Sequence, residues 1–170
     1  MTLKVLGVIL VIAGCGGVGF RIAANHHREE RSLRQLINIL NYMECELQYR
    51  LTALPDLCRQ AAKLFRGMPG VVFKELALEM DAQIAPDMDR CMSVAISKVR
   101  DIPKITFKLL ESLGKSMGKF DLDGQLKGLA AARQDCKRCL DSLEVKRDTR
   151  VRSYQTLGLC AGAALAILLI

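Results

Sequence analysis

Two cysteines, Cys136 and Cys139, have the spacing most typical of chemistry in this chain. Pairs separated by two residues form redox centres and metal sites, and the cations Lys137 and Arg138 between them would lower a thiol pKa. The pair lies inside a regular helical pattern, however, and not at a helix N-terminus that follows a strand. We therefore favour a structural role, and a membrane-anchored thiol or metal enzyme using Cys136 and Cys139 stays an alternative.

Paired carboxylates are the other candidates for acid or base chemistry, and they occur as Asp87 with Asp89 and Asp121 with Asp123. Each pair lies near an expected helix start, where negative charge is favoured by the helix dipole, so capping is the better interpretation. The chain has no GxxxxGK phosphate loop, no nucleophile elbow and no HExxH motif. We expect no enzyme, with no catalytic residue, no cofactor and no metal ligand.

Two apolar segments at the chain ends must position whatever lies between them. Residues 5–20 form a run of 16 residues without charge, and residues 157–170 form a run of 14. At about 1.5 Å per residue each run is shorter than a hydrocarbon core of about 30 Å, so flanking residues must help each run to span it. The predicted parts are an N-terminal membrane span at 1–24, a helical bundle at 25–155 and a C-terminal membrane span at 156–170.

Basic residues predict the orientation of the bundle. They follow the first apolar segment and precede the second, which by the positive-inside rule places the bundle in the cytoplasm. This charge would attract anionic membrane lipids and accounts for much of the net charge of +7, so no nucleic-acid partner is expected. The residues concerned are Arg21, Arg28, Arg31 and Arg34, and then Lys146, Arg147, Arg150 and Arg152.

The first apolar segment also contains a lipobox-like sequence, Ile12-Ala13-Gly14-Cys15. A membrane-anchored lipoprotein, lipidated at Cys15 and carrying an extracytoplasmic helical domain, is therefore an alternative. The apolar run continues past Cys15 to Phe20, without the polar spacer expected after a lipidated cysteine, which favours a membrane span. An odd total of seven cysteines, spread over helical stretches, indicates a reducing compartment and not a disulfide framework.

Between the spans the apolar pattern is helical throughout, with no alternating strand pattern. Apolar residues at 33, 36, 37, 40, 43, 47 and 51 recur at spacings of three and four, which predicts an amphipathic helix that ends before Leu54-Pro55. The further expected helices are 55–65, 72 to about 86 after a turn at 67–70, 86 to about 102, 104–117 and one from about 122, with Asp121 as its N-cap. The fold class predicted is all-α, a compact bundle of about six helices.

The last helix has the most regular pattern, a heptad seam at 122, 126, 129, 133, 136, 140 and 143 that Arg133 interrupts once. We expect it to run unbroken into the C-terminal span, so that the first and last helices pass into the bilayer side by side. Small residues in the two spans would permit close packing there. The candidates for transmembrane packing are Gly14, Gly17, Gly158, Gly162 and Ala166.

The order of these features resembles that of the stage III sporulation protein AB family, over essentially the whole chain. The residues that carry the resemblance are Leu51-Thr52-Ala53-Leu54-Pro55-Asp56, Leu113-Gly114-Lys115-Ser116-Met117-Gly118, Asp121, Gln125 and Leu157-Gly158. Members usually have glutamate where Asp56 stands, and a tryptophan expected in the fourth helix is absent. The resemblance implies a bundle like the cytoplasmic domains of the type II secretion inner-membrane platform protein.

The resemblance also implies a function in endospore-forming bacteria. It implies a platform in the mother-cell membrane that couples a cytoplasmic secretion-type ATPase to other membrane proteins of the channel between mother cell and forespore. The chain could also form a homo-oligomer, an alternative that the sequence leaves open. From motif position we expect partner contacts at Leu54, Pro55, Gly114, Gly118, Asp121 and Gln125, although each could instead shape a turn or a cap.

Overall fold

The computed structural model describes residues 27–82, 87–117 and 122–169, with side chains up to Val145 in the last helix. Six helices and no strand occupy the described part, which confirms the predicted all-α bundle. The helices are an N-terminal helix at 27–50, α2 (Leu54–Leu64), α3 (Met68–Ala82), α4 (Met88–Lys98), α5 (Lys104–Ser116) and α6 (Leu122–Leu169).

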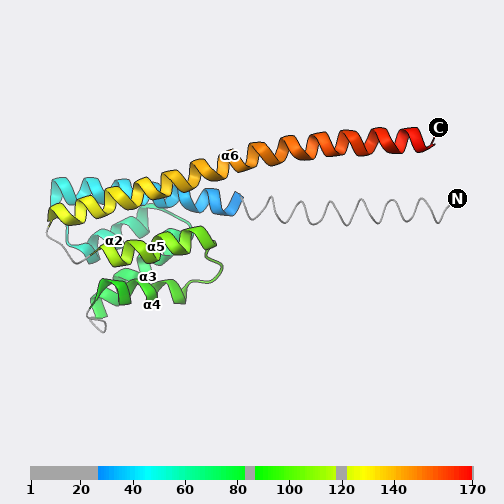
Figure 1. Cartoon of the computed structure of the whole chain (residues 1–170). Coiled ribbons are helices and arrows are strands. Elements are labelled where there is room, and N and C mark those ends of the chain that lie inside the picture. Colours follow the sequence, from blue (N-terminus) through cyan, green and yellow to red (C-terminus); the bar gives the residue numbers. More distant parts are fainter. Residues whose placement is uncertain (1–26, 83–86, 118–121, 170) are drawn as a thin grey trace.

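The six helices alternate in direction, so that each packs against its neighbour in sequence (Figure 1). The N-terminal helix begins at one end of the bundle, and α6 projects past the bundle from that same end. We call this the stalk end. The opposite end, where the N-terminal helix stops and α6 begins, is called the far end. The connection at 51–53 lies at the far end, and that at 99–103 lies at the stalk end.

Two ion pairs fix the N-terminal helix against α6. Arg34 Nη2 lies 2.7 Å from Glu144 Oε1, and Arg133 Nε lies 3.1 Å from Glu44 Oε2. From Arg34 to Glu44 the N-terminal helix advances by ten residues, while the paired positions on α6 go back by eleven, from Glu144 to Arg133. The two helices are therefore antiparallel. Arg133, the one cation in the predicted seam, is thus accommodated by a carboxylate on the facing helix.

The core lies between the N-terminal helix and the five others, and Leu and Met side chains dominate it. Its fully buried members come from every helix, among them Leu40, Leu57, Phe73, Met92 and Leu110. The α6 seam faces it, because Leu129 and Cys136 are buried and Leu126 and Leu140 pack against the cluster. Burial of such side chains stabilises the fold by about 1.5–3 kcal/mol each relative to exposure.

Prolines start two of the helices, as the sequence predicts. Pro55 occupies the first turn of α2, and Pro103 precedes α5, where its fixed φ suits helix entry and its missing N–H costs nothing. The expected helix bounds of α2, α4, α5 and α6 agree with the observed ones within a few residues. The predicted cap of α6, Asp121, lies outside the described residues.

Two local predictions are wrong. Leu51 was expected to end the apolar stripe, but it follows the helix with a φ of 52° and its surface is 66% exposed. The helix closes at residue 50, because the chain reverses there toward α2. The turn expected at 67–70 is also misplaced: the connection runs over 65–67, with Gly67 at a φ of 128°, and α3 begins at Met68 with Pro69 and Gly70 in its first turn.

The predicted N-terminal span at 1–24 lies outside the described residues. Residues 156–169 of the predicted C-terminal span form part of α6, whose backbone is one continuous helix to Leu169, while their side chains are outside the described part. Within the part of the chain that the structure describes, no helix is both long and apolar enough to cross a membrane.

Candidate interaction surfaces

The predicted contact residues Leu54 and Pro55 form the beginning of α2. Leu54 is half-buried and packs against the core. The first hydrogen bond of the helix runs from Leu57 N–H to Ala53 O, at 2.9 Å. Tyr42 then donates a 2.9 Å hydrogen bond to Gln60 Oε1 and ties α2 to the N-terminal helix. Leu54 and Pro55 therefore shape the far end of the bundle, and only part of their surface is open to a partner.

Gly114 lies in the last turn of α5 and is buried against α4. A Cβ atom at this position would lie 2.6 Å from Met92 Cβ and 2.9 Å from Met92 Cγ. Both distances are shorter than an ordinary carbon–carbon contact. Rotation of the Met92 side chain cannot relieve the clash, because its Cβ is bonded directly to the backbone. Gly114 permits the close approach of α4 and α5, and no surface for a partner is left there.

The remaining three predicted contact residues lie at or near the start of α6. Gln125 is half-buried in the second turn of α6, at the far end of the bundle. Gly118 and Asp121 lie outside the described residues. The structure thus brings the beginning of α2, the end of α5 and the beginning of α6 to the same end, although the sequence separates them by up to 70 positions (Figure 1).

Three large apolar side chains are exposed at this far end. Tyr49 is 80% exposed, Leu51 is 66% exposed and Leu122 is 40% exposed. Leu51 also holds a left-handed backbone conformation, which costs a non-glycine residue about 1–2 kcal/mol. Sequence reasoning missed this surface by assigning Leu51 and Leu122 to core stripes. The Leu54-Pro55 sequence could have indicated this surface, because it ends the first helix before Leu51. A residue beyond the last helical turn no longer lies on the apolar face that packs against the core.

The two thiols of the predicted pair differ in burial. Cys136 is 1% exposed, and burial raises its pKa to about 12, with the neighbouring Cys139 and Asp135 adding to the shift. Cys139 is half-buried on the next turn. Because the thiolate is the reactive form, Cys136 is suppressed as a nucleophile at neutral pH. Across the described residues, no group of three or more His, Cys, Asp and Glu side chains could hold a metal ion.

The predicted transmembrane packing residues are not described. Gly14 and Gly17 lie in 1–26, while Gly158, Gly162 and Ala166 lie in the part of α6 whose side chains are outside the described residues. The backbone of α6 there is helical, so the three positions recur at intervals of four along one helix.

The whole chain matches a known protein family. The family model described as stage III sporulation protein AB matches residues 4–170. Stage III sporulation protein AB of Bacillus subtilis (strain 168) is 24% identical to this chain over 170 residues, which cover 98% of this chain and 99% of that protein.

A solved structure agrees with the fold. A chain of stage III sporulation protein AB superposes with a TM-score of 0.61 at 20% identity, and the match covers 72% of this chain and 98% of the other. The likeness places the helical bundle in a known fold and says nothing of its partners.

Proposed function

This chain belongs to the stage III sporulation protein AB family, and we propose that it is a non-enzymatic membrane platform of the sporulation machinery. The family makes it a sporulation protein of an endospore-forming bacterium. The platform would stand in the mother-cell membrane with its bundle in the cytoplasm. It would couple a secretion-type ATPase to other membrane proteins of the channel between mother cell and forespore.

One observation supports the platform above the others: the two ends of the bundle differ. α6 leaves the stalk end as a continuous helix that carries the apolar residues 157–169, and the N-terminal helix begins at the same end. The antiparallel register pairs Arg34 with Glu144, and the proposal sets the N-terminal span at 1–24 beside the C-terminal span at 156–170. The two short spans would then cross the bilayer side by side.

The far end is available for the ATPase. Tyr49, Leu51 and Leu122 expose apolar surface there, at the greatest distance from the proposed membrane. Tyrosine is enriched among the residues that contribute most to protein–protein affinity, and the two leucines expose further apolar surface at the same end. We therefore move the proposed contact from Gly114 to these three side chains, beside Leu54 and Pro55.

An absence of enzymatic activity is part of the proposal and is supported by the burial of Cys136. Replacing Cys136 and Cys139 by alanine is expected to leave sporulation unchanged. A loss of sporulation at unchanged protein level would instead support the thiol or metal enzyme.

Membrane topology provides the decisive test. Single cysteines would be introduced at Thr2, Ala82 and Ile170 in the full-length protein without its seven native cysteines, and intact cells treated with an impermeant maleimide. Labelling at 2 and 170, with 82 labelled only after permeabilisation, is expected. Labelling of residue 82 in intact cells would place the bundle outside the cytoplasm, return the lipoprotein modified at Cys15 and exclude the ATPase platform.

The docking surface is tested separately. Tyr49→Ser with Leu51→Gln is expected to abolish co-purification of the secretion-type ATPase and to stop sporulation at unchanged protein level. The matched control is Val71→Gln with Leu78→Gln, which removes two exposed apolar side chains, 46% and 50% exposed, from α3. Equal loss in both variants would show a general need for apolar surface and would contradict a specific site at the far end.

A further inference from the structure

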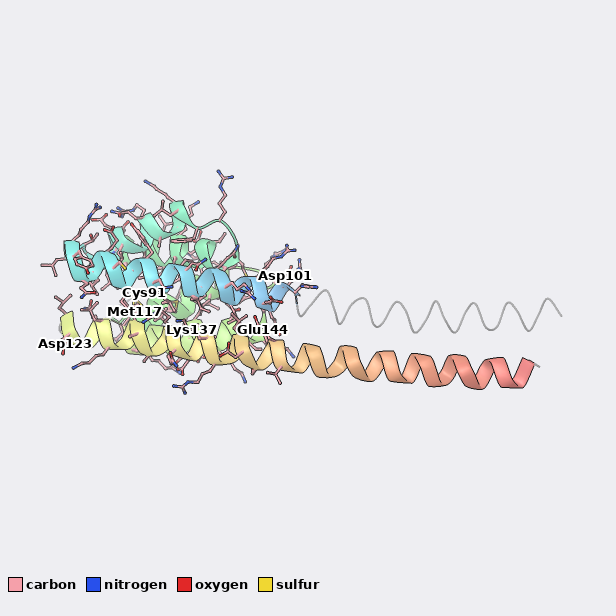
Figure 2. The ribbon with its side chains drawn as sticks, turned by 90° about the horizontal axis from the view of Figure 1, so that it is seen from above. Cys91, Asp101, Met117, Asp123, Lys137 and Glu144 are labelled. Atoms are coloured by element: carbon pink, nitrogen blue, oxygen red, sulfur yellow. The ribbon has the colours of Figure 1, made fainter. Side chains whose placement is uncertain are left out.

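The connection between α4 and α5, at 99–103, lies at the stalk end beside the start of the N-terminal helix. Figure 2 shows Asp101 at this end, while Asp123 marks the far end. Asp101 has a φ of 61°, a left-handed conformation that aspartate tolerates better than most residues, and it reverses the chain into α5. The connection is therefore a tight turn that reaches toward the side on which α6 leaves the bundle.

This connection has both half-buried and exposed side chains. Val99 and Ile102 are half-buried and pack against the core cluster. Arg100 and Lys104 are exposed, and neither makes an ion pair within the described residues. Two apolar anchors thus hold the turn in place while it presents two free cations.

The level of this turn along α6 follows from two contacts. Thr106, near the start of α5, donates a buried 3.1 Å hydrogen bond to Ser32. Ser32 precedes Arg34 by two residues, and Arg34 pairs with Glu144, so Thr106 lies level with about residue 146 of α6. From residue 146 to the start of the apolar segment at Leu157 is about 16 Å of helix.

The turn lies nearer to that segment than Thr106 does. Lys104 precedes Thr106 by two residues, or about 3 Å of helix, which leaves about 13 Å to the level of Leu157. The polar layer of a bilayer takes up about 5–7 Å outside the hydrocarbon core. The remaining distance is within the Debye length of about 8 Å at physiological ionic strength, so lipid charge is felt at this level.

We propose that Arg100 and Lys104, presented by the α4–α5 turn, bind the head groups of anionic lipids and set the bundle upright on the membrane. The proposal rests on the membrane anchoring proposed above. It adds a second contact, far from the anchoring helices in sequence, and it gives a role to two exposed cations that have no ion-pair partner within the described residues. Arg28 and Arg31, exposed at the start of the N-terminal helix, would face the same lipid surface.

The chain contains no tryptophan, so single tryptophans report position without background. Ser97→Trp places one on exposed α4 surface beside the turn, and Gln48→Trp places one near the far end. Full-length protein would be reconstituted into vesicles of phosphatidylcholine, with or without phosphatidylglycerol, that contain a dansyl head-group lipid. Energy transfer from tryptophan to dansyl is the readout, and flotation of the vesicles measures anchoring.

Transfer from position 97 is expected to exceed that from position 48, and to be higher with phosphatidylglycerol than without it. Arg100→Gln with Lys104→Gln should remove most of the phosphatidylglycerol-dependent part, as should about 1 M salt, which shortens the Debye length to about 3 Å. The charge-matched control, Lys74→Gln with Lys137→Gln, removes two exposed cations elsewhere and should leave the transfer unchanged.

Two results would overturn the inference in different ways. If the protein floats with the vesicles but transfer from position 97 is the same with and without phosphatidylglycerol, or survives the loss of Arg100 and Lys104, the membrane anchoring stands and the lipid contact is wrong. If no variant floats, the anchoring itself fails and the lipid contact fails with it.

Discussion

Adding a single methyl group at Gly114 tests the closest helix contact in the bundle. In Gly114→Ala the new Cβ would lie 2.6 Å from Met92 Cβ, so α4 and α5 must separate by about 1 Å to restore ordinary contact. Overpacking of this kind costs about 3 kcal/mol at its upper end, and alanine returns about 1 kcal/mol through its higher helix propensity. We expect a net loss of about 2 kcal/mol in the free energy of unfolding.

Gly128→Ala is the matched control, because it makes the same change in a helix without the same crowding. Its Cβ would lie 3.5 Å from Ser116 O, an ordinary contact, so only the propensity gain applies. We expect this variant to be more stable by about 0.5–1 kcal/mol.

Urea unfolding of full-length protein in detergent, followed by circular dichroism, measures both changes. Their difference should be about 3 kcal/mol, which corresponds to about 6–12 °C between the two melting temperatures. If Gly114→Ala is as stable as Gly128→Ala, the helix contact does not limit the position and the reasoning fails. A sporulation defect with normal stability would return Gly114 to the role of a partner contact.

Three further predictions follow from the described contacts. Arg133→Ala leaves the half-buried Glu44 without its ion-pair partner and should lower the free energy of unfolding by about 1–3 kcal/mol, whereas replacing both residues by leucine should be near neutral. Equal losses in urea unfolding would contradict this. Burial raises the pKa of Cys58 and Cys136 to about 12, so the unfolded state loses these protons first as the pH rises, and stability should fall by about 1 kcal/mol per thiol between pH 8 and 9.5. Unfolding curves that do not change over this range, or a fall that remains in Cys58→Ala with Cys136→Ala, would contradict the assignment. Leu51→Gly removes the left-handed strain and should keep or raise stability by about 0.5–1 kcal/mol while weakening ATPase co-purification; a loss of stability would show that the leucine side chain supports the fold.

The helix pattern could be predicted from the sequence because its signals are local. Pro55 and Pro103 each restrict their own backbone and that of the preceding residue, which favours a helix start at these positions. The seam through Leu129 and Cys136 is a repeat of apolar residues along one face of a long helix. Such features depend on residues a few positions apart. Helix class and approximate bounds therefore follow without knowledge of the tertiary structure.

The candidate site could not be predicted in the same way. Whether Gly114 opens a surface or closes a helix contact depends on Met92, which lies 22 positions away. Whether Leu51 is core or surface depends on where the helix stops, and a spacing of four fits both outcomes. The ion pairs of Arg34 and Arg133 depend on antiparallel packing across about 100 residues, which no local pattern encodes.

The pairing of the N-terminal helix with α6 also joins the two ends of the bundle. Ion pairs connect the two helices at two levels, Arg133 with Glu44 and Arg34 with Glu144, which are about 16 Å apart along α6. Between these levels Cys136 and Leu140 of α6 pack against the core. Because interiors are close-packed, a displacement of either helix at the far end would have to be accommodated by the other helix along this length.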